Sequence, residues 1–168
     1  VTIDGNDVRK LTLESLRSQI GLVSQDVYLF GGSIKDNIAY GKPDATMDEI
    51  VDAAKKANIH DFIMELPDKY DTFVGERGTR LSGGQKQILN LAAIMAMHPS
   101  LLILDEPTSQ LDPIAASDFL ETVKKINRDI GTTVLLTEHR LQDIIPYADR
   151  VFVMDKGNVY LEGTPREI

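Results

Sequence analysis

Two carboxylates and a histidine are the residues of this sequence whose types and positions best suit phosphate chemistry. Asp105 and Glu106 end one apolar run, and His139 follows a second run, 132–137. Ligands of open α/β sheets bind at the carboxyl ends of strands. There Asp105 could hold Mg²⁺, Glu106 could polarise an attacking water, and His139 could orient the water or contact a γ-phosphate. The alternative is that the acids form only a polar turn and that His139 is a cap or a surface residue.

A glycine pair stands where another apolar helix is expected to begin. Ser82, Gly83, Gly84 and Gln85 precede the apolar run 88–97, so the free N–H groups of the helix start would form an anion site. Ser82 and Gln85 also have the spacing of a capping box, which is the alternative interpretation. A capping box leaves the glycines unexplained, since each costs a helix roughly 1 kcal/mol relative to alanine but lets a phosphate approach the backbone.

The elements that would position these residues alternate between apolar runs and helical patterns, which predicts an α/β fold with a mainly parallel sheet. Strands are expected at 20–24, 101–105, 132–137, 150–155 and 158–162. The run 101–104 is expected to be buried on both faces. Gln25 follows the first strand and could reach the same metal or water. Helix starts are indicated by the capping pair Thr46 and Glu49 and by Asp112.

Composition narrows the function classes. The chain has 168 residues, which is the size of one domain, and no cysteine, so neither disulfides nor thiolate metal sites are available. Its 18 basic and 26 acidic residues give a net charge of −8, which argues against nucleic acid as a partner. No segment approaches the roughly 20 apolar residues that span a bilayer, so we expect a soluble chain.

Taken together, the motifs resemble those of ABC (ATP-binding cassette) transporter nucleotide-binding domains. Val23 to Asp26 resembles the Q-loop, Leu81 to Gln85 the signature motif, Leu101 to Glu106 Walker B, Ser109 to Asp112 the D-loop, and His139 the switch histidine. The resemblance covers essentially the whole chain. It implies a partial P-loop NTPase (RecA-like) core, expected at 1–25 and 100–168, with an inserted α-helical signature subdomain at 26–99.

The resemblance also implies a function: an ATPase domain that powers transport of an unknown solute. ATP would be sandwiched in a head-to-tail homo- or heterodimer, with a transmembrane domain or subunit as a further partner and a cytoplasmic location at the inner face of the membrane. The resemblance implies that Glu106 is the general base, that Asp105 binds Mg²⁺, that Gln25 senses the water and the metal, and that His139 is the switch at the γ-phosphate. It also implies that ATP is bound by Ser82, Gly83, Gly84, Gln85 and Asp112. The apolar cluster 28–30 would dock the membrane domain, or else pack in the core.

The sequence departs from the family pattern in two respects. Walker A, the phosphate-binding loop, is absent, because the only Gly-Lys pair is Gly41-Lys42 and it lacks the earlier glycine. We therefore expect this loop and the adenine-stacking aromatic residue upstream, and negligible ATP turnover by this chain alone. The stretches 32–41 and 72–78 resemble exporters, and the part from Gln85 onward resembles importer ATPases, especially those of the energy-coupling-factor type. We therefore hypothesise a chimeric junction near residues 81–87. A non-catalytic truncated or chimeric fragment and a non-transport ABC ATPase are the alternative functions.

Overall fold

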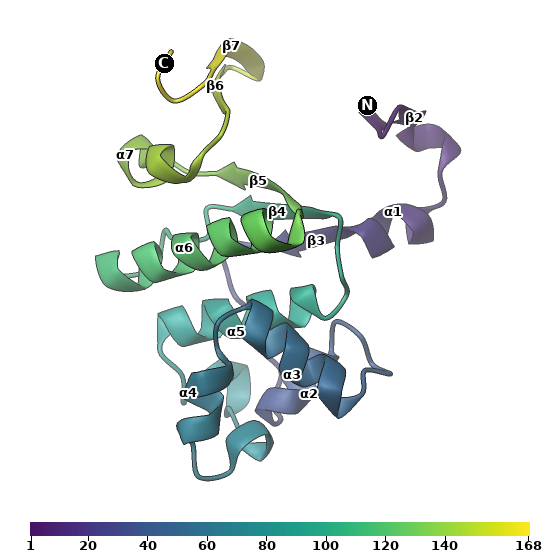
Figure 1. Ribbon diagram of the computed structural model, residues 1–168, viewed down its shortest axis with the longest axis vertical. Helices are drawn as coiled ribbons and strands as arrows, with labels where there is room; N and C mark the ends of the chain where they lie inside the picture. The colour runs from purple at the N-terminus through teal and green to yellow at the C-terminus, as the bar shows by residue number, and fades with distance from the viewer.

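A parallel sheet lies at the centre of the computed structural model, which describes residues 1–168 (Figure 1). Its strands are β3 (Ile20–Val23), β4 (Leu101–Asp105) and β5 (Thr133–Thr137), in the order β3-β4-β5. Both pairings are parallel. The predicted α/β class and parallel sheet are confirmed, and the carboxyl ends of the strands meet at one edge of the sheet.

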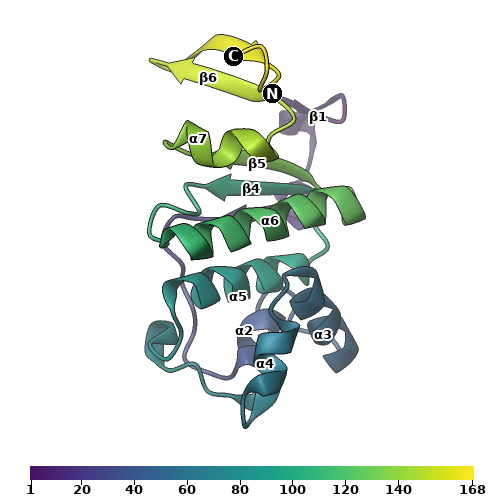
Figure 2. The same ribbon diagram turned by 60° about the vertical axis from the view of Figure 1, so that its left-hand side comes forward.

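The two longest helices, α5 (Gly83–Met95) and α6 (Pro113–Ile130), cover the same face of this sheet (Figure 2). Leu102 and Leu104 point to that face and are fully buried. On the opposite face Leu22, Ile103 and Leu135 form one row across the strands, and Leu22 is 57% and Leu135 50% exposed. The expectation that β4 is buried on both faces is therefore wrong, because both long helices pack on one side.

A group of short helices packs beneath α5 (Figure 2). These are α2 (Ile34–Ala39), α3 (Met47–Lys56) and α4 (His60–Glu65), followed by the 3-10 turns η2 (Lys69–Asp71) and η3 (Glu76–Gly78). The capping box predicted at Thr46 and Glu49 is present, and Ser33 and Asp36 form another. Such boxes satisfy the free N–H groups of a helix start within a few residues, so these helices begin where local sequence dictates.

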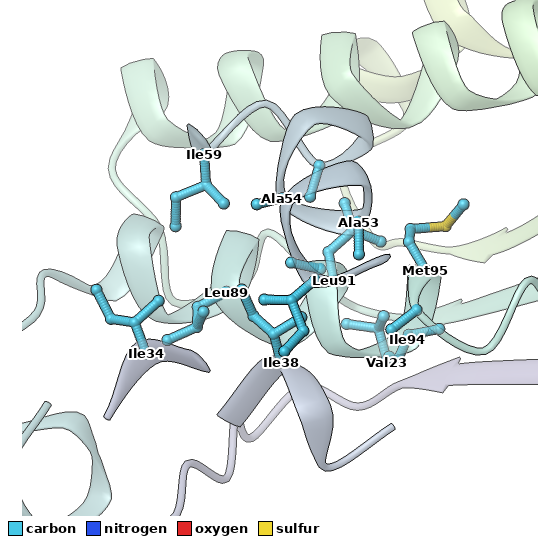
Figure 3. Packing of buried hydrophobic residues seen from close by; sticks show 14 of the residues in the cluster. Val23, Ile34, Ile38, Ala53, Ala54, Ile59, Leu89, Leu91, Ile94 and Met95 are labelled. Carbon is cyan, nitrogen blue, oxygen red and sulfur yellow. The ribbon is translucent and has the colours of Figure 1, made fainter. Parts of the chain in front are cut away.

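One hydrophobic core runs from the sheet into these helices. It contains 23 buried residues. Figure 3 shows side chains of α2, α3 and α5 converging, among them Ile38, Ala53 and Leu91. The expected division into 1–25 plus 100–168 and 26–99 stays a prediction, because the same core extends across both parts.

The ends of the chain form two small units beside the central sheet (Figure 1). At the start, β1 (Thr2–Ile3), β2 (Asn6–Asp7) and the 3-10 turn η1 (Val8–Lys10) lead into α1 (Leu13–Gln19). After β5 come α7 (Leu141–Ile144), the 3-10 turn η4 (Ile145–Tyr147), and the hairpin β6 (Val151–Asp155) and β7 (Asn158–Gly163).

The hairpin is a sheet of its own. The strands predicted at 150–155 and 158–162 are present, and Gly157 makes the turn between them with φ +79°. They pair only with each other, however, and do not extend the central sheet. No helix of the structure is both long enough and apolar enough to cross a bilayer.

Candidate functional site

Glu106 and His139 meet at the carboxyl ends of β4 and β5. The Nε2 atom of His139 lies 2.7 Å from Oε1 of Glu106, and the His139 side chain is 83% exposed whereas that of Glu106 is 27% exposed. Strand adjacency explains the encounter, because β4 and β5 are parallel neighbours. The structure thus brings an acid and an imidazole together at an accessible edge, an arrangement that can position and deprotonate a water molecule.

The backbone at Glu106 is held in an unusual conformation. Its φ is +46°, in the left-handed region, which costs an L-residue about 1–2 kcal/mol. The Glu106 N–H donates to the carbonyl oxygen of Thr137 at 3.1 Å and lies 3.2 Å from the Thr137 hydroxyl. Strain of this kind persists only where the surroundings enforce it, and it concentrates at functional sites.

Asp105 is the other acid at this edge. Its side chain is exposed, and Oδ1 accepts a 2.7 Å hydrogen bond from the hydroxyl of Thr137, its register partner on β5. No group of three or more acids and histidines forms a ready metal cage. Mg²⁺ in phosphate sites usually takes only one or two carboxylates and completes its shell with water and phosphate oxygens. Asp105 and Glu106 supply ligands of that type.

Gln25 lies at the same edge but apart from the acid-histidine pair. Gln25 lies two residues after Val23, the last residue of β3, and the register partner of Val23 is Leu104. The Gln25 side chain is exposed. No hydrogen bond joins it to Asp105, Glu106 or His139. The topology therefore sets Gln25 at the same edge of the sheet as Asp105 and Glu106, and its role stays a prediction.

The start of α5 combines a capping box with an exposed glycine. The Ser82 hydroxyl accepts from the Gln85 N–H at 3.2 Å, and the Gln85 side chain accepts from the Ser82 N–H at 3.0 Å. The capping interpretation of these two residues is confirmed. Their side chains hold the helix start in place, and Ser82 and Gly83 are exposed there.

The two glycines of this helix start differ in their surroundings. A Cβ atom on Gly84 would lie 3.0 Å from Cβ of Ala115, so close packing of α5 on α6 favours glycine there. A Cβ atom on Gly83 would lie 3.7 Å from Leu111, an ordinary contact. Since Gly83 has a helical, negative φ, neither packing nor backbone conformation requires a glycine at this position. Close approach of a ligand to the backbone remains as a physical reason for it.

The segment 109–112 joins the start of α6 to the loop after β3. Asp112 caps α6, and its Oδ1 accepts from the N–H groups of Ile114 and Ala115 at 3.0 Å each. Its carboxylate is therefore already engaged by the helix. Gln110 donates from Nε2 to Asp26 Oδ1 at 3.0 Å. This contact links the predicted D-loop to the predicted Q-loop.

The cluster 28–30 divides between core and surface. Leu29 is 3% exposed and belongs to the core, so the packing alternative holds for this residue. Tyr28 and Phe30 are exposed, and their ring centroids lie 5.1 Å apart. Phe30 also contacts Tyr40, which follows α2, with ring centroids 4.0 Å apart. We call Tyr28, Phe30 and Tyr40 the aromatic patch.

The pair Gly41-Lys42 is not a phosphate-binding loop. A Cβ atom on Gly41 would lie 1.9 Å from the backbone carbonyl oxygen of Ala93, so this glycine serves the close packing of the chain against α5. Lys42 forms an ion pair with Glu49. Both residues therefore have structural tasks away from Glu106.

Several residues around Glu106 escaped sequence reasoning. Thr137 contacts both acids, Glu138 binds Thr108, and Gln87 binds the carbonyl oxygen of Pro107. The position of Thr137, a polar residue at the end of an apolar strand, is the one sequence signal that could have indicated its role. The other contacts join distant parts of the chain, and no local pattern signals them.

Comparisons with known proteins agree with these motifs. The family model described as ABC transporter matches residues 1–109. A multidrug export ATP-binding/permease protein of Bacillus subtilis, YgaD, is 48% identical over 166 residues, which is 99% of this chain and 28% of that protein. A protein of the same description from Staphylococcus aureus is 48% identical over 168 residues, 100% of this chain and 28% of its own length.

The fold has a solved counterpart. The structure of a bacterial Atm1-family ABC exporter with ATP bound matches with a TM-score of 0.86 and 40% identity, over 99% of this chain and 28% of that one. The chain thus spans 28% of the length of each of these relatives. Each match runs through both halves of the chain, and the hypothesis of a junction near residues 81–87 stays a prediction. The matching family model and these relatives together show that the chain belongs to the ABC transporter family.

Proposed function

We propose that this chain is part of an ATP-hydrolysing domain that powers an ABC exporter. The Glu106–His139 pair carries the proposal, since it sets a base beside an imidazole at the carboxyl edge of a parallel sheet. Glu106 takes the proton of the attacking water, and His139 orients that water or contacts the γ-phosphate. Asp105, with Gln25 nearby, would hold Mg²⁺, which neutralises phosphate charge when bound.

The phosphate-binding loop is expected to come from residues outside 1–168. One feature supports this proposal: the edge of β5 is unpaired beside the Glu106–His139 pair. A further strand along β5 would carry its own loop to the same edge as Glu106, because parallel strands end together.

A second nucleotide-binding domain is the proposed partner at the start of α5. Gly83 is exposed and not required by packing, and the N–H groups of a helix start attract phosphate. Ser82, Gly83 and Gly84 would bind ATP held by the partner domain, while Gln85 shapes the helix start through its capping contact. Asp112 acts through the α6 cap.

The aromatic patch is the proposed contact with the membrane-spanning part, at the inner face of the membrane. Tyr28 and Phe30 follow the predicted Q-loop, and Tyr40 extends their surface. Exposed aromatic clusters are typical of protein interfaces. The names of the exporter relatives, which combine ATP-binding and permease parts, favour such a contact.

The test is the ATPase activity of the complete transporter that carries this chain. Removal of a general base typically costs about 10²–10⁴-fold in rate, so Glu106→Gln and His139→Ala should each lower kcat by about 10²-fold or more. Glu14→Gln is the matched control, because Glu14 is an exposed glutamate on α1. Unchanged turnover in Glu106→Gln would refute the proposed base.

A further inference from the structure

The turn that follows β4 determines where the Glu106 side chain points. Glu106 has φ +46°, and Pro107, with no N–H group, and Thr108 are buried behind it. The turn is closed by the N–H of Ser109, which donates to the carbonyl oxygen of Glu106 at 3.2 Å. A left-handed residue relaxes unless neighbouring contacts hold it, so these contacts decide whether Glu106 faces His139.

Glu138 binds this turn from the loop after β5. Its Oε1 accepts from the Thr108 N–H at 3.0 Å and from the Thr108 hydroxyl at 2.5 Å. Because Glu138 precedes His139 in the chain, the Glu138–Thr108 bonds and the Glu106–His139 contact form two adjacent links between the same pair of loops. Hydrogen bonds to an ionised carboxylate are roughly twice as strong as neutral ones.

Gln87 holds the turn from the other side. It lies on α5, one helical turn after Gly83, and is 1% exposed. Its Nε2 donates to the carbonyl oxygen of Pro107 at 2.9 Å. The opposite orientation of the amide would set two acceptor oxygens against each other, so the donor assignment is secure. The turn is thus tied both to the helix that begins at the glycine pair and to the histidine loop.

We infer that Glu138 is a positioning residue, which clamps Thr108 so that Glu106 faces His139, while Gln87 anchors the same turn to α5. The inference rests on the proposed ATPase function. Glu138 acts through the turn and does not touch the reacting atoms. Loss of the clamp should therefore lower kcat and leave the KM for ATP unchanged. The hydrogen bond from Gln87 to Pro107 also joins α5 to the turn that carries Glu106. It therefore connects the two proposed nucleotide contacts of this chain, the start of α5 and the Glu106 site.

The test uses the complete transporter and measures kcat, KM and thermal stability for Thr108→Val, Thr108→Ser and Glu138→Gln. Thr108→Val keeps the shape of the side chain and removes the hydroxyl donor, whereas Thr108→Ser keeps that donor. Since a hydrogen bond to a charged group contributes enough for roughly a tenfold effect or more, kcat should fall about tenfold in Thr108→Val and Glu138→Gln. KM should stay within about twofold, and Thr108→Ser should retain kcat within about twofold.

The double variant Thr108→Val/Glu138→Gln should lose less activity than the product of the two single losses, because both substitutions weaken the contact between the same two residues. Glu14→Gln is again the control for loss of a glutamate charge. Full kcat in Thr108→Val, or an equal loss in Thr108→Ser, would overturn the inference while the ATPase function stands. A transporter whose unaltered form hydrolyses no ATP would instead overturn the proposed function itself.

Discussion

Replacement of Gly83 by alanine is expected to affect protein stability and nucleotide binding in different ways. The added methyl would meet only Leu111 Cδ2 at 3.7 Å and the Gln110 carbonyl oxygen at 3.9 Å, which are ordinary contacts. Alanine favours a helix over glycine by up to about 1 kcal/mol. For a domain of this size, 1 kcal/mol raises Tm by about 2–4 °C. We therefore expect Gly83→Ala to unfold at the same temperature as the unaltered protein or up to about 4 °C higher.

The same methyl occupies the space through which a phosphate would approach the N–H groups of α5. One lost hydrogen bond to a charged oxygen costs about 1.5–3 kcal/mol, which corresponds to roughly 10- to 100-fold. Gly83→Ala should therefore lower the ATPase kcat/KM of the complete transporter by at least about tenfold. A variant that is as stable as the unaltered protein, or more so, and yet impaired is the expected result.

Alanine substitutions at two further glycines serve as comparisons for Gly83→Ala. Gly31→Ala is the matched control, since Gly31 is exposed and no atom lies within 4 Å of its added Cβ; both Tm and ATPase activity should stay unchanged. Gly84→Ala brings a Cβ to 3.0 Å from Ala115 and should cost about 1 kcal/mol through overpacking. Calorimetry and steady-state ATPase assays provide the measurements. Normal ATPase activity in Gly83→Ala, or a Tm lowered by more than about 4 °C, would refute the reasoning.

Gly41→Ala should destabilise the protein by about 3 kcal/mol or more in urea unfolding, because its Cβ would lie 1.9 Å from a backbone carbonyl oxygen of α5. Asn37→Ala should cost about 2 kcal/mol in the same assay, since the buried amide pairs with both the N–H and the carbonyl oxygen of Phe30. Hydrogen bonds from the Ser33 side chain and backbone hold the pKa of Asp36 below its ordinary value. The Asp36 carboxylate therefore stabilises the fold at pH values above its ordinary pKa. This stabilisation is lost as the pH falls through the lowered pKa of the folded state. Asp36→Asn should therefore be less stable than the unaltered protein at pH 7, with a difference that shrinks below pH ~4 in thermal unfolding.

Local patterns accounted for much of the fold. The strands β3, β4 and β5 were predictable because each is a short apolar run. The starts of α3 and α6 were predictable because Thr46 and Asp112 cap them within three residues. The bare face of the sheet was not predictable, since the row containing Leu22 and Leu135 looks the same in sequence whether or not something covers it.

The candidate site, like the fold, was predictable from the sequence only in part. The position of Glu106 beside His139 followed from strand order alone. The left-handed backbone of Glu106 and the clamp between Glu138 and Thr108 depend on contacts across 30 residues of sequence, which periodicity does not reveal. The aromatic patch was only partly anticipated, because Tyr40 reaches it from α2 through packing.

The uncovered face of the central sheet also bears on how residues 1–168 behave when produced by themselves. Leu22, Ile103 and Leu135 lie in one apolar row beside the unpaired edge of β5. Open strand edges next to apolar surface are templates for pairing between chains. Molecules of this chain are expected to self-associate with rising concentration, and a charged residue in place of Leu135 should keep the chain monomeric.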